Sequence, residues 1–579
     1  MIFHDSQNLY YRSPIGAVPT QSFVRLAIDV DLKDKVSLVR LHTWQETCGS
    51  IYYNLKKSSW DEKHYFIDLD MPEDGCLLWY YFIIELVDGK LLYYGNNKAQ
   101  MGGIGQEALE VPPSYQITVF KKDVKTPDWF KKAVMYQKKH AVLHCDWNEP
   151  PMYYLDPDTK NVITYDYFGG NIQGIKEKLS YLKDLGISVI YFNPIFKSRA
   201  NHHYDTADYH QVDPMFGTNE EFAQLCSQAK EMGIRIILDG VFSHTGSDSI
   251  YFNRFGNFDS VGAYQSKESP YYEWYDFKEY PCKYDCWWGF TSMPNTKETT
   301  PSYMDFIIRS EDSVMNFWMD KGISGWRLDV IDELPQKFTR CFYQKLKKLD
   351  KDAVIIGEVW EDASNKIAYN VHREYLCGYE MDSAMNYPLR RIILDFILKN
   401  KSAQETEVSI LNQHENYPEE NLYAMMNLLG SHDVERILTL LGEAPSVENV
   451  PASVQAKFKL DDAHLRLAIA RLKLAVVWQM TLPGVPSIYY GDEIGMQGYR
   501  DPHNRASYKW DEADNNLRHF FTRMIALRNH RQVLQTGWYI PVYAQDDVLA
   551  YMRTTKLGKD RFGQKMDDDC ILVVLNRHQ

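Results

Sequence analysis

The chain has 579 residues, enough for more than one domain, and a formal net charge of −14 with a sequence pI near 5.7. This acidity argues against a nucleic-acid partner, since phosphate binding needs a basic surface. No run of 18 apolar residues and no secretion signal are visible, and nine scattered Cys residues favour reduced thiols, so we expect a cytoplasmic protein with no membrane span.

Residues 1–122 are predicted to form an N-terminal β-sandwich. Segments such as FVRLAIDV, SLVRLHTW and LLWYYFIIELVDG are rich in β-branched and aromatic residues and are separated by turn residues. The polar stretch 121–132, which contains a Pro, indicates a linker to the next domain.

Residues 123–530 alternate between strand and helix patterns, and about eight repeats predict a closed (β/α)8 barrel. Strands are predicted at 133–137, 187–194, 234–239, 324–329, 353–358, 378–382, near 430 and at 485–490, with helices at 172–184, 311–321, 334–348, 388–399, 463–480 and 514–529. Thr218 and Glu221 form a capping box for a further helix. The segment 243–305 breaks the rhythm and predicts an inserted subdomain after the third strand. Residues 531–579 return to short strands and suggest a short or truncated C-terminal β-domain.

Two predicted strands, at 324–329 and 353–358, end in the carboxylates Asp329 and Glu358, with a helical pattern between them. A right-handed crossover makes such strands parallel neighbours, so both acids should lie at one end of the sheet. Glycoside hydrolysis with retention needs two carboxyl groups about 5 Å apart. Arg327 lies on the strand face of Asp329 and should keep Asp329 ionised as the nucleophile. Glu358, flanked by Val359 and Trp360, should be desolvated and act as the proton donor.

Other polar side chains follow apolar runs and should reach the same rim: Asp239, His244, His432 and Asp433. Taken singly, each acid is more simply explained as a helix or loop cap, and each His as structural. Together they fit a site in which Asp433 stabilises an oxocarbenium-like transition state, with the two His residues as hydrogen-bond donors.

Aromatic residues near this rim provide candidate sugar contacts. Tyr204, in HHYDTADYHQVDPMFG, offers a stacking face for the sugar that is cleaved. Trp288, with Trp287 and Phe290, either forms a platform beside the cleft or belongs to a small core of the insertion. The close pair Cys282 and Cys286 lacks a second ligand pair, so no metal site is predicted there.

These motifs resemble the α-amylase family, glycoside hydrolase family 13. LDGVFSH, GWRLDVIDE, IIGEVW and LLGSHD resemble its four signature regions in order, and GVPSIYYGDEIGM and HHYDTADY resemble its last-strand and early sugar-binding segments. The β-rich start with MIFHDS and SMPN is similar to the neopullulanase, cyclomaltodextrinase and maltogenic amylase group. The resemblance implies that Asp329 is the nucleophile, Glu358 the acid/base and Asp433 the transition-state stabiliser. It also implies that Arg327, His244, His432, Asp239 and Tyr204 bind substrate. It further implies that the N-terminal domain is of a glucan-binding or dimerisation type, which forms a homodimer contact or shapes the cleft.

Several positions depart from the family pattern. Ser243 replaces Asn, Asp332 replaces Asn in the second signature region, Asn171 replaces Asp, and MPNTKETT lacks the usual Lys-Leu. The segment after the first strand, KKHAVLHCDWNE, replaces the one that carries the calcium loop in this group. We therefore expect no required cofactor, with calcium as a weakly supported alternative.

Three functions fit this sequence. The first is a retaining hydrolase of α-1,4 links in maltooligosaccharides, cyclodextrins or related α-glucans. The second is an α-glucan transglycosylase, in which a sugar hydroxyl instead of water attacks the same intermediate. The third is a non-catalytic glucan-binding relative, which would need neither Asp329 nor Glu358.

Overall fold

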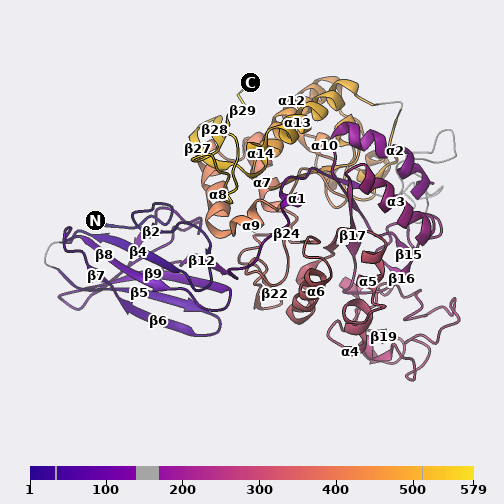
Figure 1. Ribbon diagram of the computed structural model, residues 1–579, viewed down its shortest axis with the longest axis horizontal. Helices are drawn as coiled ribbons and strands as arrows, with labels where there is room; N and C mark the ends of the chain where they lie inside the picture. The colour runs from indigo at the N-terminus through magenta and orange to yellow at the C-terminus, as the bar shows by residue number, and fades with distance from the viewer. Residues whose placement is uncertain (33–34, 139–168, 511–512, 579) are drawn as a thin grey trace.

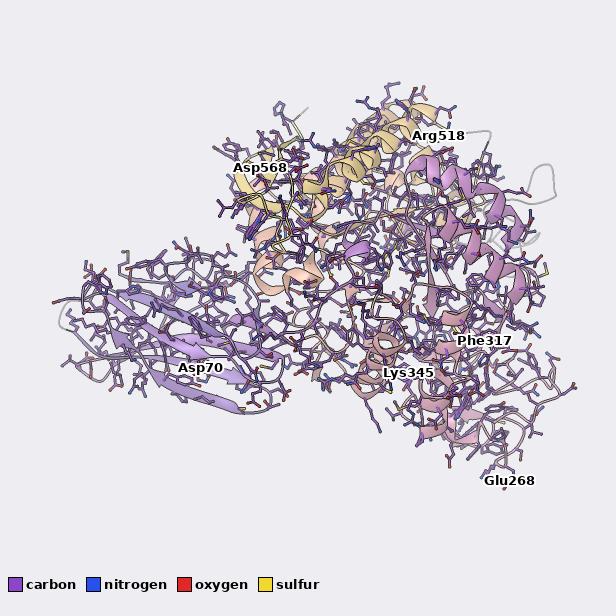
Figure 2. The ribbon with its side chains drawn as sticks, viewed as in Figure 1. Asp70, Glu268, Phe317, Lys345, Arg518 and Asp568 are labelled. Carbon is purple, nitrogen blue, oxygen red and sulfur yellow. The ribbon has the colours of Figure 1, made fainter. Side chains whose placement is uncertain are left out.

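The computed structural model describes residues 1–32, 35–138, 169–510 and 513–578. Most of the divergent segment after the first barrel strand, 138–149, lies outside these residues, and so does the prediction about calcium that depends on it. Figure 1 shows a β-domain, coloured indigo, beside a larger α/β domain that carries a small C-terminal sheet. Figure 2 places Asp70 of the β-domain and Glu268 of the insertion at opposite ends of the molecule.

The N-terminal domain consists of two sheets packed face to face, as predicted. One sheet contains β1 (Ile2–Phe3), β2 (Arg12–Ser13), β4 (Phe23–Val30), β7 (Lys56–Lys57) and β8 (His64–Asp70). The other contains β3 (Val18–Pro19), β5 (Val36–Gln45), β6 (Gly49–Asn54), β9 (Cys76–Leu86), β10 (Leu91–Gly95), β11 (Gln106–Ala108) and β12 (Tyr115–Phe120). Alternate residues of each strand, such as Leu26, Ile28, Tyr80 and Phe82, fill the core between the sheets.

Eight parallel strands form the barrel. In spatial order they are β24 (Ser383–Ala384), β21 (Val354–Gly357), β20 (Gly325–Leu328), β17 (Arg235–Gly240), β14 (Val189–Phe192), β13 (Met135–Lys138), β26 (Val485–Tyr489) and β25 (Met426–Leu428). A parallel bridge between Met385 and Met426 closes the ring. The predicted crossover is confirmed, since β20 and β21 pair in parallel with Leu328 opposite Gly357.

Helices surround these strands. The longer ones are α2 (Ile172–Leu185), α3 (Asn219–Glu231), α5 (Val314–Asp320), α6 (Gln336–Leu349), α7 (Tyr387–Ile397), α8 (Ala403–Asn416), α12 (Asp462–Thr481) and α13 (Asn515–His530). The shorter ones are α1 (Asp128–Lys131), α4 (Pro301–Met304), α9 (Glu419–Leu422), α10 (Ile437–Leu441), α11 (Ala452–Gln455) and α14 (Gln532–Thr536). The capping box of Thr218 and Glu221 is present at the start of α3. Among the helices of the described residues, none is long and apolar enough to cross a membrane.

Two details differ from the predicted elements. Residues 378–382 form a turn, and the strand follows them as β24, because Glu380 accepts a hydrogen bond from Thr339 Oγ1 (2.7 Å) and Asp382 accepts one from the amide of Ile355 (2.9 Å). The helix α8 was not predicted, although Ser402 and Glu405 form a capping box at its start.

The insertion and the flanking sheets complete the chain. Two hairpins follow β14 and the third strand: β15 (Phe196–Ser198) with β16 (Thr206–Val212), and β18 (Phe277–Glu279) with β19 (Lys283–Tyr284). A third hairpin, β22 (Ile367–Ala368) and β23 (Val371–His372), follows β21. The C-terminal sheet contains β27 (Trp538–Gln545), β28 (Val548–Thr554) and β29 (Cys570–Asn576).

The sandwich is attached to the barrel mainly through α8. Arg12 and Glu415 form a fully buried ion pair (2.8 Å), and Thr118 Oγ1 donates a hydrogen bond to the carbonyl of Asn416 (2.6 Å). Gln116 Nε2 also donates to Ser364 Oγ (3.1 Å). These contacts fix one end of the sandwich near the loops that follow β21.

Candidate active site

The guanidinium of Arg327 joins three carboxylates at the carboxyl ends of three neighbouring strands. Its Nη1 lies 2.7 Å from Asp239 Oδ1 and 2.8 Å from Asp329 Oδ1, and its Nη2 lies 2.6 Å from Glu358 Oε2. All four side chains are buried. The parallel register explains the grouping, because Asp239 on β17 is the cross-strand partner of Arg327 on β20, and Glu358 directly follows β21.

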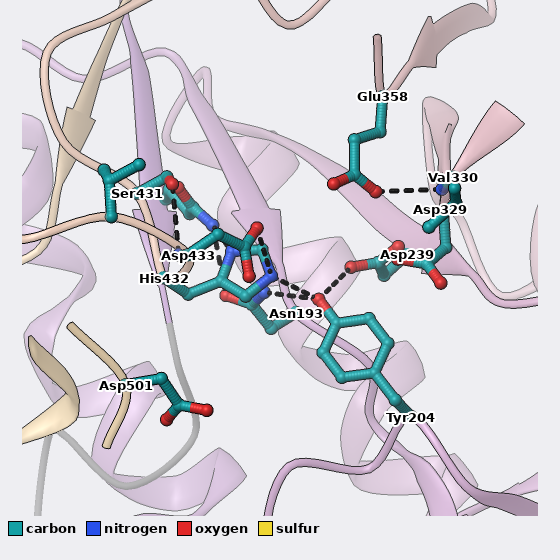
Figure 3. A network of polar contacts seen from close by, with 12 residues as sticks. Asn193, Tyr204, Asp239, Asp329, Val330, Glu358, Ser431, His432, Asp433 and Asp501 are labelled. Atoms are coloured by element: carbon teal, nitrogen blue, oxygen red, sulfur yellow. Dashed lines mark hydrogen bonds and ion pairs between the residues drawn. The ribbon is translucent and has the colours of Figure 1, made fainter. Parts of the chain in front are cut away.

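Glu358 is held by groups that follow the strands (Figure 3). The amide of Val330 donates to Glu358 Oε2 (2.8 Å), and Trp360 Nε1 donates to Oε1 (3.0 Å). Val330 has a φ of +37°, which is strained for a β-branched residue. This backbone turn immediately after Asp329 aims the Val330 amide at Glu358, so the two acids are positioned relative to each other by one short segment.

A second group of residues surrounds Tyr204. Its Oη contacts His432 Nε2 (2.5 Å) and donates to Asp239 Oδ2 (3.2 Å), which also accepts from Tyr191 Oη (2.7 Å). The Tyr204 and His432 rings lie nearly parallel, with centroids 5.7 Å apart. Gln137 Nε2 lies 2.7 Å from His432 Nδ1 on the other side of the ring. Tyr204 therefore links the Arg327 cluster to the end of β25.

Asp433 faces this group from the loop after β25. One of its oxygens lies 3.2 Å from His432 Nε2, and the other lies 3.7 Å from Arg505 Nη2. Burial and the charge of Glu358 raise the pKa of Asp433 to about 7, against the opposing charge of Arg505. Asp433 thus titrates near neutrality before substrate binds.

The pKa of Asp329 differs from the prediction that Arg327 keeps this carboxyl ionised. Burial raises the pKa of Asp329 well above its ordinary value, and the charge of Arg327 opposes this but does not overcome it. Burial also raises the pKa of Asp239. One guanidinium cannot neutralise three carboxylates, so the cluster favours the uptake of a proton.

His244 and Trp288 were also predicted to bind substrate. His244 Nε2 donates to the carbonyl of Tyr204 (3.1 Å), and burial lowers the pKa of His244 to about 4, so the ring is neutral. Trp288 makes no contact with the three carboxylates around Arg327. Its side chain is 78% exposed, and its Nε1 donates to Glu333 Oε1 (2.9 Å). It lines a cavity of about 440 Å³ that also includes Trp287, whose ring lies 5.6 Å from that of His244. Trp288 is therefore not part of an insertion core.

The structure brings together eight of the nine predicted site residues and adds several that the sequence did not indicate. The added residues are Gln137, Tyr191, Asn193 and Arg505, whereas Trp360, expected only to shield Glu358, also donates a hydrogen bond to it. Gln137 ends the first predicted strand, which was a usable signal, whereas Arg505 lies on a loop without a motif. Asp332, a departure from the family pattern, accepts a hydrogen bond from Tyr375 Oη (2.7 Å).

Metal binding was predicted only as a weak alternative, through calcium. Among the described residues, no group of three or more His, Cys, Asp or Glu side chains is arranged to hold a metal ion. The segment on which the calcium prediction depends, 138–149, lies outside those residues except for Lys138.

Comparisons with known proteins agree with this geometry. The sequence profile described as "Alpha amylase, catalytic domain" matches residues 147–535. An amylopullulanase from Thermoanaerobacter thermohydrosulfuricus is 36% identical over 99% of this chain, and the match covers 42% of that protein. A cyclomaltodextrinase from Thermoanaerobacter pseudethanolicus is 35% identical over 79% of this chain and 72% of its own length. A solved structure of a cyclomaltodextrinase covers 99% of this chain and 91% of its own, with 26% identity and a TM-score of 0.66.

The lengths of these relatives differ from that of the chain. The chain spans less than half of the amylopullulanases that it matches, between 33% and 48%. The fold, the carboxylates at the barrel rim and the profile match over most of the barrel nevertheless agree. The chain belongs to the α-amylase family.

Proposed function

We propose that this protein hydrolyses α-1,4-glucosidic bonds of maltooligosaccharides, cyclodextrins or related α-glucans, with retention of anomeric configuration. The observation that carries the proposal is the pair Asp329 and Glu358, bound by opposite nitrogens of the Arg327 guanidinium at the ends of adjacent strands. Retaining glycosidases need two carboxyl groups about 5 Å apart that flank the bond to be cleaved.

In the first half-reaction, Asp329 attacks the anomeric carbon and forms a glycosyl ester, while Glu358 gives its proton to the departing glycosidic oxygen. In the second, Glu358 removes a proton from water, the water oxygen attacks the anomeric carbon, and the Asp329 carboxylate leaves. Each displacement inverts the carbon, so the product keeps the configuration of the substrate.

The raised pKa of Asp329 and of Asp239, which favours a proton within the carboxylate cluster, suits this cycle. Glu358 must be protonated and Asp329 ionised when the glycosidic bond breaks. The positive charge that develops on the sugar favours the ionised form of Asp329 and of Asp433. In this proposal Asp433 and His432 hold sugar hydroxyls, and Tyr204 stacks on the sugar ring.

The substrate class follows from the family and from the names of the relatives, which include cyclomaltodextrinase and amylopullulanase. A compartment is also inferred: the eight cysteines among the described residues are all free thiols, which supports action in the cytoplasm. A homodimer contact through the sandwich, with no nucleic acid or membrane partner, remains a prediction.

Transglycosylation is a second candidate. The cavity beside Trp288 and Glu333 could hold a sugar that acts as acceptor in place of water. The chemistry of the first half-reaction is the same, so only the products distinguish the two functions.

The test is a time course with maltotriose, α-cyclodextrin and pullulan. Proton NMR within the first minutes should show α-anomeric reducing ends before mutarotation, and a β-anomer would contradict retention. Sized products from maltotriose should be maltose and glucose. Early products longer than maltotriose would replace the hydrolase proposal with transglycosylation, and no turnover of any of the three would support the non-catalytic alternative.

A further inference from the structure

A single buried amide holds the loop that carries Asp433. Asn504, in the helical turn His503–Arg505, is fully buried. Its Nδ2 donates hydrogen bonds to the carbonyl oxygens of His432 and Val434, both at 2.8 Å. These acceptors belong to the residues immediately before and after Asp433, so the two bonds fix the chain on both sides of it.

The orientation of the Asn504 amide follows from its surroundings. A third carbonyl oxygen, that of Ser431, lies 3.4 Å from the same nitrogen. The reverse orientation would place Oδ1 against three acceptors, and an amide oxygen has no proton to give them. Among the described residues nothing donates to the buried Oδ1. Asn504 therefore acts on this loop through its nitrogen, whose two protons match the two short bonds.

The backbone of Asn504 is itself well supported. Its carbonyl accepts a hydrogen bond from Tyr489 Oη (3.3 Å), at the end of β26. Gly498 packs directly against this turn, since a Cβ on it would lie 2.3 Å from the carbonyl oxygen of His503. The carbonyl of Gly498 in turn accepts from the amide of Arg436 (3.0 Å), just before α10. The amide thus reaches the loop from a segment that is tied to two neighbouring elements.

The same loop is held on the side of Glu358 by a different set of contacts. Ser431 Oγ accepts from the amide of Asp433 (3.2 Å, Figure 3) and lies 3.1 Å from Tyr387 Oη. The Tyr387 ring stacks on that of Trp360, with centroids 4.0 Å apart, and Trp360 donates to Glu358. The position of Asp433 relative to Glu358 therefore depends on two supports, of which Asn504 is one.

The place of the Asp433 carboxylate depends on the backbone that carries it. The guanidinium of Arg505 lies 3.7 Å from this carboxylate, and such a charge contact varies slowly with distance. Hydrogen bonds to the backbone are short and directional, so those from Asn504 restrict the loop more closely. Stabilising a developing charge requires the opposite charge at a fixed place, and a displacement of about 1 Å can cost about 100-fold in rate.

We propose that Asn504 is a positioning residue, which holds Asp433 where positive charge develops on the sugar. This rests on the proposed function, and it gives a fully buried side chain a part in the reaction through the backbone of its neighbours. The competing explanation is that Asn504 stabilises the fold and has no effect on the chemical step.

The kinetic test uses Asn504→Ala, which removes the donor. It should lower kcat on maltotriose about tenfold or more and change KM less than about twofold, because the lost alignment matters most in the transition state. Asn504→Asp is the conservative variant. Burial should keep the new carboxyl protonated, so it still donates one of the two bonds, and kcat should fall only about threefold.

Asn421→Ala is the matched control. Asn421 is also buried, and its Nδ2 donates to the carbonyl of Asp382 (3.0 Å), which precedes β24 at the end of the barrel opposite the carboxylates. This variant should lose thermal stability much as Asn504→Ala does and keep its kcat. If Asn504→Ala also kept its kcat, or raised KM alone, the positioning role would be wrong. Asn504→Asp carries the test if Asn504→Ala does not fold.

A binding arm addresses the charge directly. Calorimetry compares maltose with glucosyl isofagomine, a ligand of the same size whose ring amine carries positive charge at the anomeric position. In Asn504→Ala the affinity for the charged ligand should fall about tenfold and that for maltose less than about threefold. Equal losses for both ligands would overturn the proposal, since Asn504 would then only shape the site.

The unmodified protein separates this inference from the proposed function. If it neither cleaves maltotriose nor binds either ligand, the proposed function fails. If it is active and both Asn504 variants match it in kcat and in affinity for the charged ligand, the function stands and the positioning role alone is refuted.

Discussion

Two fully buried arginines, Arg327 and Arg553, show how different partners give the same side chain different uses. Arg327 contacts three carboxylates at the barrel rim. Arg553, on β28, donates to three backbone carbonyls: those of Thr481 (2.6 Å) and Leu534 (2.9 Å) from Nη1, and that of Gly537 (2.9 Å) from Nη2. The pKa of Arg327 lies well above its ordinary value because of its acidic neighbours, whereas burial lowers that of Arg553.

The difference separates a reactive site from a structural one. Carbonyl oxygens are neutral and fixed, so Arg553 satisfies the end of α12 and the C-terminal sheet without any group that can change its protonation. Around Arg327 the negative groups outnumber the positive one, and burial together with the charges of Glu358 and Asp239 raises the pKa of Asp329. Such like-charge crowding costs stability and is typical of catalytic sites.

The largest expected effect comes from the crowded site. Asp329→Asn should lower kcat on maltotriose by about 10⁴-fold or more, as loss of a nucleophile does in other hydrolases. The same change should not destabilise the protein, because it removes one of three buried acids that share a single guanidinium. Activity and urea unfolding measured on the same preparation check both statements. Activity that survives at a tenth of the original rate would remove Asp329 as the nucleophile.

Arg553→Met should have the opposite profile. It removes three hydrogen bonds to buried carbonyls and leaves the carbonyl of Thr481 without another donor among the described residues, whereas Leu534 still accepts from Arg528 and Gly537 from Tyr423. We expect a loss of about 2 kcal/mol or more in the free energy of unfolding. At a temperature where the variant is folded, KM and kcat on maltotriose should stay close to the original values. Arg25→Met is the control: Arg25 pairs with Asp68 at the surface, with side chains 51% and 46% exposed, and should cost less than about 1 kcal/mol. A large fall in kcat in Arg553→Met would contradict the assignment of Arg553 to a purely structural role.

The sequence predicted much of the barrel because the strand–helix alternation and the capping box at Thr218 are local features. It missed α8 even though its capping box was readable, and it placed a strand at 378–382, where buried carboxylates bond to neighbouring elements instead. The apolar pattern of a segment predicts its secondary structure well when that segment is one of the repeated strands or helices of the barrel. It predicts poorly where a few polar contacts with distant residues set the backbone conformation, as at 378–382.

For the candidate site, the sequence predicted which acids meet but not how they share charge. Asp329, Glu358 and Asp239 all end apolar runs, so their common rim followed from strand order. The proton balance depends on burial and on the number of acids around Arg327, which no local pattern reports. Arg505 was missed for a related reason, since its approach to Asp433 depends on how a loop without a motif folds back.

A substitution at the exposed Trp288 should have a smaller effect than the substitutions at Asp329 and Arg553. Trp288→Ala should raise KM for maltooligosaccharides several-fold and change kcat little, because Trp288 lies outside the carboxylate cluster and its ring is open to a sugar. Phe255→Ala is a suitable control, as Phe255 is a 51% exposed aromatic that does not line the cavity. A fall in kcat with unchanged KM would place Trp288 in the catalytic step instead.

The finest test concerns the charge around Asp433. Asp433 stabilises a positive transition state only when ionised, and its pKa is raised to about 7, so kcat/KM should fall as the pH drops below about 7. The charge of Asp501, on a separate loop in Figure 3, contributes to this increase. Asp501→Asn removes that charge and frees Arg505, which it contacts at 3.0 Å, so the acidic limb should move to lower pH. Asp68→Asn, in the sandwich, should leave the limb in place. If the acidic limb of the pH profile moves to higher pH or does not move, a group other than Asp433 limits activity at low pH. The excess negative charge would then be confined to the Arg327 cluster.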